Sequence, residues 1–174
     1  MTVELRDLIS GLALVVSLGV VLRTELRARN DFKVAWYREV VSWARDCVRS
    51  MSAAHELCAS HITDQKYISD QRHKVLGDLT SLIDEGRFLF ENDRSVRIGM
   101  EKPRAYQGAR PRIIDYLVLA YDRIREMDAD ADPNVREFFC SHIIDAKRHF
   151  VSDIQKAIEP RWFARRAQFA AKIQ

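Results

Sequence analysis

The chain has 174 residues, of which 47% are hydrophobic and 30% are charged, and its net charge is +3. That length corresponds to one domain with a short additional segment. The small positive charge does not indicate a nucleic-acid partner. The three cysteines, Cys47, Cys58 and Cys140, are odd in number and widely spaced, which favours reduced, packed thiols over a disulfide framework.

The first predicted element is an apolar helix over Leu8–Leu22, fifteen residues without a charge. At 1.5 Å per residue it extends about 22 Å, against about 30 Å of bilayer hydrocarbon. Arg6 and Arg23 at its ends can reach lipid headgroups along their aliphatic stems. We therefore predict a membrane anchor, with a buried core helix as the alternative. A cleaved signal peptide is disfavoured because no small-residue cleavage site follows the run.

Basic residues follow the apolar run closely, at Arg23, Arg27, Arg29 and Lys33. The positive-inside rule then predicts a single-pass protein of the inner (cell) membrane, with the N-terminus outside and the C-terminal domain in the cytoplasm. Membrane lipid is accordingly an expected partner. Small residues within the run also allow two spans to pack closely, which predicts a homo-oligomer through Ser10, Ala13 and Ser17.

Four amphipathic helices are predicted after the anchor, because apolar residues recur at intervals of three and four. The first has its apolar face from Tyr37 to Cys58, and it continues from the anchor through a bend near Asn30–Asp31. The others contain Ile68 to Ile83, Ile113 to Ile124 and Val135 to Ile154. Their ends are marked by an Asp64 cap, Gly86 as a C-terminal stop, Pro111 as an opening residue, and an Asp132–Pro133 start.

The predicted fold class is therefore all-α, with an N-terminal transmembrane helix followed by an antiparallel four-helix bundle. Residues 1–29 form the membrane anchor and juxtamembrane helix. Residues 30–159 form a cytoplasmic helical bundle, and residues 160–174 form a basic tail.

One irregular loop, residues 86–112, interrupts the helical pattern. Phe88–Phe90 and Ser95–Ile98 could pair there as a short hairpin. Seven basic and three acidic residues give this segment a charge of +4, and aromatic residues lie among them. Loops of this length are often functional, and guanidinium groups suit phosphates or carboxylates. The predicted ligand-binding residues are Arg87, Arg94, Lys102, Arg104, Tyr106 and Arg110; the alternative is a connector pinned by ion pairs.

Two pairs, Arg49/His55 and Arg136/His142, place arginine and histidine six residues apart on a helix. They resemble the Arg-x4–6-His motif of HEPN-type ribonucleases, in which histidine would shuttle a proton beside a phosphate-binding arginine. The spacing is permissive, so we assign no catalytic residue. Cys58-x2-His61 and Cys140-x-His142 lack the tight paired spacing of structural zinc sites, and no metal or cofactor is predicted.

The segments WYREVVSWARD, AHELC, GRFLFEND and KPRAYQGARPRIIDYLVLAY resemble a family of small, uncharacterised bacterial proteins. The resemblance covers most of residues 36–121, and it implies a single N-terminal span with a cytoplasmic helical domain. It implies no activity. The predicted function is a non-enzymatic, membrane-anchored helical module that binds an unidentified protein partner or an anionic ligand. The alternative is a membrane-tethered HEPN-like ribonuclease.

Overall fold

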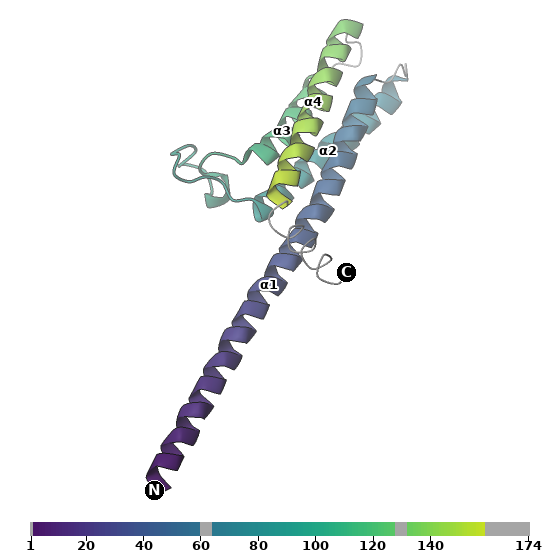
Figure 1. Ribbon diagram of the computed structural model, residues 1–174. Coiled ribbons are helices and arrows are strands. Elements are labelled where there is room, and N and C mark those ends of the chain that lie inside the picture. The colour runs from purple at the N-terminus through teal and green to yellow at the C-terminus, as the bar shows by residue number, and fades with distance from the viewer. Residues whose placement is uncertain (1, 60–63, 128–131, 159–174) are drawn as a thin grey trace, which may run out of the picture. The chain divides into compact units, whose positions relative to one another are not determined.

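The computed structural model describes residues 2–59, 64–127 and 132–158; for residues 2–15 it describes the backbone alone. The predicted basic tail, 160–174, lies outside these ranges. The described residues form four α-helices and a 3-10 turn, η1, and contain no β-strand (Figure 1). The all-α class and the helical bundle are thus confirmed. The helices are α1 (Thr2–Ala59), α2 (Gln65–Leu89), α3 (Arg112–Glu126) and α4 (Pro133–Ile158), with η1 at Arg104–Tyr106.

The chain divides into two compact units, Met1–Glu39 and Val40–Gln174. The first is wholly helical over its described residues, and α1 continues without a break through the predicted bend at Asn30–Asp31. Many of its described apolar side chains are exposed, with Leu26 62% and Phe32 74% accessible to solvent. Its one ion pair among the described residues, Arg29 with Glu25 at 2.6 Å, lies on the surface.

No helix in the described part of the chain is both long and apolar enough to cross a membrane. This finding corrects the prediction of a transmembrane anchor at Leu8–Leu22 and, with it, the single-pass inner-membrane location. The physical reason is length. A span needs about 20 predominantly apolar residues. Any stretch of about that length containing Leu8–Leu22 includes at least three charged residues, drawn from those on either side of it.

Homo-oligomer formation through Ser10, Ala13 and Ser17 stays a prediction. The side chains of Ser10 and Ala13 lie outside the described residues, whereas that of Ser17 is exposed.

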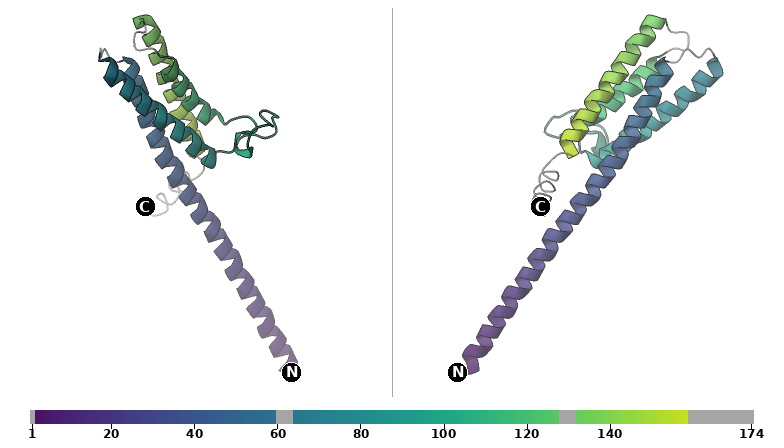
Figure 2. Two further views of the ribbon diagram at one scale, coloured as in Figure 1. Left: turned by 180° about the vertical axis from the view of Figure 1, so that it is seen from behind. Right: turned by 45° about the vertical axis from the view of Figure 1, so that its right-hand side comes forward.

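The second unit is an antiparallel bundle formed by the last twenty residues of α1 with α2, α3 and α4 (Figure 2). Two of the predicted helix starts are confirmed by their caps. The Asp64 carboxylate accepts the backbone N–H groups of Lys66 and Tyr67 at 3.0 and 3.1 Å. The Asp132 carboxylate accepts the N–H of Asn134 at 2.8 Å, and Pro133 is the first residue of α4. Each cap satisfies N–H groups that have no partner within the helix.

Polar contacts between neighbouring helices fix their antiparallel register. Arg72 Nε near the start of α2 donates to the carbonyl of Ile124 near the end of α3, at 3.1 Å. Tyr116 near the start of α3 donates to Asp153 near the end of α4, also at 3.1 Å. The α1 and α4 helices are joined by Lys147, whose ammonium donates to the Ser52 hydroxyl at 3.2 Å.

The core holds most of the apolar residues that the helical spacing predicts, but Val135 and Phe138, predicted to face inward on the fourth helix, are 43% and 51% exposed. Met51, Leu79, Leu117, Ile143 and Phe150 are each fully buried, and each helix contributes at least one of them. Burial of side chains of this size stabilises the fold by roughly 1.5–3 kcal/mol each, before the entropy lost on folding is counted.

Trp43 connects three of the helices. Its indole Nε1–H donates to the carbonyl of Leu82 on α2 at 2.9 Å, in a buried position. Its ring lies 5.6 Å between centroids from Phe150 on α4 and 5.6 Å from Phe90 at the end of α2. A buried indole N–H needs such a hydrogen-bond partner. The residue therefore fixes the register of α1 against α2 at the end of the bundle from which the loop leaves.

Gly86 is not the end of α2, as the sequence suggested, because α2 continues to Leu89. The glycine is required by packing instead. A Cβ at this position would lie 2.7 Å from the Trp43 ring carbon Cζ2, closer than a real Cβ approaches another heavy atom. The missing side chain makes room for the indole.

Replacement of two glycines in α2 separates packing from helix propensity. Gly86→Ala should lower the free energy of unfolding by about 1–3 kcal/mol, because the added methyl group overpacks a rigid ring. Gly77→Ala is the matched control. No atom lies within 4 Å of the Cβ it would add, so better helix propensity should raise stability by up to about 1 kcal/mol. Urea unfolding followed by circular dichroism measures both, and equal changes would contradict the assigned packing role.

Candidate functional site

Residues 90–111, here called the basic loop, connect α2 to α3 and project from one end of the bundle (Figure 1). The loop closes at a neck, where Asp93 and Ala109 exchange backbone hydrogen bonds of 2.8 and 2.9 Å. The hairpin predicted between Phe88–Phe90 and Ser95–Ile98 is wrong, because Phe88 and Leu89 belong to α2. The neck instead pairs residues near the two ends of the loop.

Gly108 makes the close approach at the neck possible. Its φ is 88°, in the region that side-chain-bearing residues rarely adopt. A Cβ added there would lie 2.5 Å from the carbonyl oxygen of Asp93. The Gly108 N–H also donates to the carbonyl of Ile98 at 2.8 Å, which draws the outer part of the loop toward the neck.

Two side-chain amides hold the interior of the loop. Asn92 Nδ2 donates to the carbonyls of Gln107 and Ala105 at 2.9 and 3.3 Å. Gln107 Nε2 donates to the carbonyls of Lys102 and Met100 at 2.8 and 3.1 Å. These bonds satisfy backbone acceptors that no regular structure satisfies here. Sequence reasoning missed both residues because it weighed charges and aromatic rings, not amides.

A local turn adds order just above the neck. The Asp93 carboxylate accepts the N–H of Ser95 at 2.9 Å and its hydroxyl at 2.6 Å. These two bonds favour the charged form, so they lower the pKa of Asp93 below its ordinary value. Asp93 is therefore engaged within the loop as an ionised acceptor.

Three of the six predicted ligand-binding residues lie at the base of the loop and make structural contacts. The Arg87 guanidinium lies over the Tyr106 ring, 4.3 Å from its centroid, and pairs with Asp84 at 3.5 Å. The Tyr106 hydroxyl donates to the same carboxylate at 3.4 Å. Arg110 pairs with Asp115 at 3.0 Å. For these three residues, the structure matches the alternative of a connector pinned by side-chain contacts.

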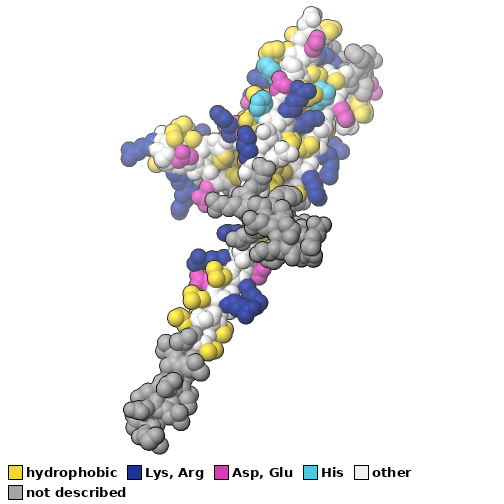
Figure 3. Space-filling view, viewed as in Figure 1, with side chains coloured by type: hydrophobic (Ala, Val, Ile, Leu, Met, Phe, Trp, Pro, Cys, Tyr) yellow, Lys and Arg dark blue, Asp and Glu magenta, His cyan; other side chains and the backbone are white. Residues whose placement is uncertain are grey.

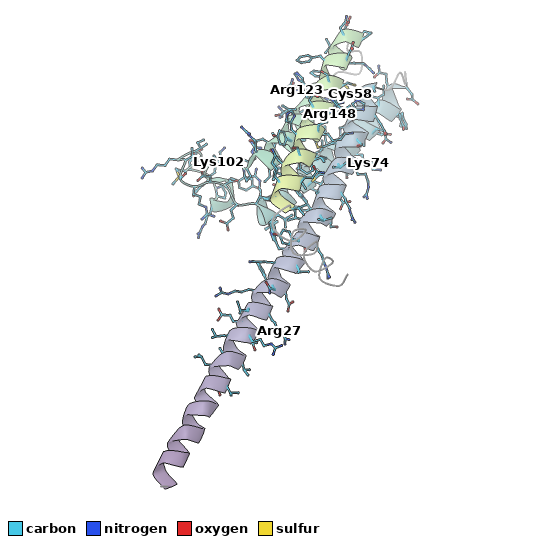
Figure 4. All side chains as sticks on the ribbon, in the orientation of Figure 1. Arg27, Cys58, Lys74, Lys102, Arg123 and Arg148 are labelled. Atoms are coloured by element: carbon cyan, nitrogen blue, oxygen red, sulfur yellow. The ribbon has the colours of Figure 1, made fainter. Side chains whose placement is uncertain are left out.

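The other three, Arg94, Lys102 and Arg104, are exposed and form no ion pair within the described part of the chain, and Arg97 shares both properties. We call these four residues the rim cations. Figure 4 labels Lys102 far out on the loop. The basic side chains lie around the loop, with apolar and acidic groups between them (Figure 3). The six predicted residues thus fall into a paired base and an unpaired rim.

Apolar side chains are exposed beside the rim cations. Val96 is 40%, Ile98 55% and Met100 59% accessible, and all three alternate in sequence with rim cations or glycine. Exposed apolar groups gathered on one loop, rather than scattered singly, are typical of an interaction surface.

The cysteines are packed thiols. Cys47, Cys58 and Cys140 are all free, and burial raises the pKa of Cys58 to about 12, with the neighbouring Cys140 acting in the same direction. In the described ranges no cluster of three or more histidine, cysteine or carboxylate side chains could hold a metal ion. His61, one of the residues considered as a ligand, lies outside those ranges.

The two arginine–histidine pairs serve other contacts. Arg49 pairs with Asp46 at 2.8 Å on the surface. The backbone carbonyl of His55 accepts the Cys140 thiol at 3.9 Å. The His142 ring packs against Phe138, 4.0 Å between centroids. The ribonuclease alternative stays a prediction, which RNA cleavage by the intact protein and by His55→Ala and His142→Ala variants would test.

Comparison with known proteins identifies no relative. The chain matches no protein-family model, no curated protein and no solved structure. The resemblance to a bacterial family noted above therefore stays a prediction.

Two glycines of the loop provide a test of the neck. Gly108→Ala should make the amides of Asp93, Gly108 and Ala109 exchange hydrogen about tenfold faster or more. The reason is that the left-handed conformation costs alanine about 1–2 kcal/mol, and the methyl group meets a carbonyl oxygen. Gly99→Asn is the control, since asparagine tolerates a φ of 64° and the nearest atom to its Cβ is the movable Cδ of Lys102. Hydrogen exchange with mass spectrometry reads both variants, and equal protection in the two would show that the neck does not order the loop.

Proposed function

We propose that the protein is a non-enzymatic helical binding module whose basic loop binds a protein partner that presents carboxylates beside apolar side chains. The observation that carries the proposal is the rim itself. Four exposed cations without ion pairs in the described structure share one loop with exposed Val96, Ile98 and Met100.

The mixed character of the rim favours a protein surface over a small anion. A phosphate or carboxylate ligand is usually held by several donors that converge on it. Here the unpaired cations are spread along a loop whose convergent amide donors, Asn92 and Gln107, are already used by backbone carbonyls. A partner with spaced carboxylates and an apolar centre matches this arrangement, and the flexible thioether of Met100 adapts to varied apolar surfaces.

The internal bonds of the loop reduce the entropy lost on binding. A disordered basic segment would be ordered only at the moment of association, which weakens affinity. The neck at Asp93 and Ala109, together with the bonds from Asn92 and Gln107, orders the backbone before a partner arrives. The stacking of Arg87 on Tyr106 holds that backbone against the end of α2.

A synthetic peptide of alternating glutamate and leucine is a suitable probe, with binding read by fluorescence anisotropy. Each exposed ion pair contributes about 0.2–1 kcal/mol, and reversing a charge replaces attraction with repulsion. Lys102→Glu/Arg104→Glu should therefore weaken peptide binding about tenfold and leave the thermal midpoint nearly unchanged. Raising the salt concentration should weaken binding to the unaltered protein as well.

The control variant is Arg45→Glu/Lys66→Glu, which changes the net charge equally. Both residues are exposed on the bundle and form no ion pair among the described residues. Equal loss of binding in both variants would show a general charge effect and overturn the proposal. Displacement of the peptide by free inorganic phosphate would indicate that the loop binds a small anionic ligand instead. Unfolding of the Lys102/Arg104 variant would show that these cations are structural.

A further inference from the structure

The helix of the first unit exposes apolar residues that nothing in the described chain covers (Figure 3). Every residue from 16 to 33 is exposed, and Val16, Leu18, Leu22 and Leu26 are each more than half accessible to solvent. A helix in water gains most of its stability by packing an apolar face against another element. This helix therefore presents a face that a partner would stabilise.

The apolar residues of this helix follow a seven-residue repeat. Alternate steps of three and four residues from Leu5 define seven positions, which we call the seam: Leu5, Leu8, Leu12, Val15, Gly19, Leu22 and Leu26. Only Gly19 among them is not a large aliphatic residue. This is the a/d pattern of a coiled coil, in which a repeat of 3.5 residues keeps one side of a helix facing its partner.

The length of the repeat distinguishes a partner helix from a flat surface. A straight helix has 3.6 residues per turn, so a stripe with that period that begins at Leu5 would pass over Arg23 and Arg27. The repeat of 3.5 residues reaches Leu22 and Leu26 instead. A face with this shorter repeat fits a second helix that winds around the first, whereas a membrane surface would contact the straight stripe.

The same spacing marks the residues through which α1 packs in the second unit. Continued beyond Leu26, it falls on buried residues that include Val40, Trp43, Cys47, Ala54 and Leu57. Between the two stretches it falls on Arg29 and Lys33, both exposed, and Arg29 is paired with Glu25 at 2.6 Å. These charges end the seam, which is thus an apolar stretch separate from the core of the bundle.

Polar residues recur on the side of the helix opposite the seam. Ser10, Ser17 and Thr24 are seven residues apart and stand half a turn from the seam positions. Ser17 and Thr24 are exposed, and the Thr24 hydroxyl donates to the carbonyl of Val20 at 2.8 Å. A polar line opposite an apolar seam is the pattern of a helix that has water on one side and another helix on the other.

We propose that a second copy of this chain covers the seam, so that two α1 helices form a coiled-coil dimer over residues 5–26. Identical helices carry the same repeat, and most soluble oligomers are symmetric assemblies of one chain. The contact uses the seam and not the face of Ser10, Ala13 and Ser17.

The area of the seam suffices for a stable dimer. Nine aliphatic residues occupy the seam and the positions that flank it: Leu5, Leu8, Ile9, Leu12, Val15, Val16, Leu18, Leu22 and Leu26. Burying a residue of this kind removes roughly 60–120 Å² from water, so two copies would together remove roughly 1,100–2,200 Å². Stable protein interfaces bury about 1,200–2,000 Å².

Sedimentation velocity of the full chain, in buffer without detergent, measures the association. The mass should rise with concentration from 20.2 kDa toward twice that value. Leu22→Asp/Leu26→Asp should raise the concentration at which half of the chains are dimeric about a hundredfold or more, because each copy then buries charges in place of aliphatic groups. Leu22→Met/Leu26→Met should keep the dimer, since methionine retains the apolar volume.

The matched control is Ser17→Asp/Thr24→Asp, which adds the same charge on the opposite side of the helix and should leave the dimer intact. Near-ultraviolet circular dichroism, which reports the packing of Trp43 in the second unit, verifies that the bundle of each variant stays folded.

Four results would overturn the coiled coil. A chain that stays monomeric at high micromolar concentration would exclude it, and sedimentation of that monomer with phosphatidylglycerol vesicles would show that lipid covers the seam. Equal dissociation by the seam and control variants would show general charge repulsion. Dissociation by the Ser17/Thr24 variant only would place the contact on the opposite face. An oligomer that persists in the Leu22/Leu26 aspartate variant would show that another surface holds the copies together.

Discussion

The indole of Trp43 is the constraint on which the arrangement of the bundle depends. One side chain donates a buried hydrogen bond to Leu82 on α2, packs on Phe150 of α4 and occupies the space left by Gly86. A large aromatic ring is difficult to move in a close-packed interior, so its position sets the register of the helices around it. Phe90, also in contact with Trp43, is the first residue of the basic loop. The interaction that joins the helices therefore also fixes where the loop begins.

The loop continues this order outward by different means. Beyond Phe90 the only regular structure in the loop is the short turn η1, and most of the other bonds pass to Asn92, Gln107 and the bridge between Asp93 and Ala109. Buried or half-buried backbone groups need partners wherever they lie, and a loop without regular structure must take them from side chains. This accounts for the presence of amides inside the loop and charges on its rim. A rigid frame with an exposed periphery is a suitable support for binding, because little motion is lost on association.

The helices could be predicted because their signals are local. Apolar spacing, the Asp64 cap and the Asp132–Pro133 start each depend on residues within one turn, and all three agree with the structure. The role of Gly86 could not be predicted, since the ring that requires it comes from Trp43, more than forty positions earlier. The apolar run Leu8–Leu22 was misassigned for a related reason: its composition was weighed without the charged residues that enter when it is extended to a spanning length. Of the loop site, the basic composition was predictable, but not which cations would be paired.

The division between paired and unpaired cations follows from backbone geometry. On the helices, a carboxylate three residues away lies on the same face, and Arg49, Arg123 and Arg148 each pair in this way. Helical periodicity thus pairs some of the surface cations locally, although others, such as Arg45 and Lys66, form no ion pair among the described residues. The rim of the loop has no such period, and the one acidic side chain at its neck, Asp93, is engaged by Ser95. The rim cations therefore keep their charge available. Unpaired cations also occur on the helices, and what sets the basic loop apart in the described chain is that its unpaired cations lie on an ordered backbone beside exposed apolar side chains.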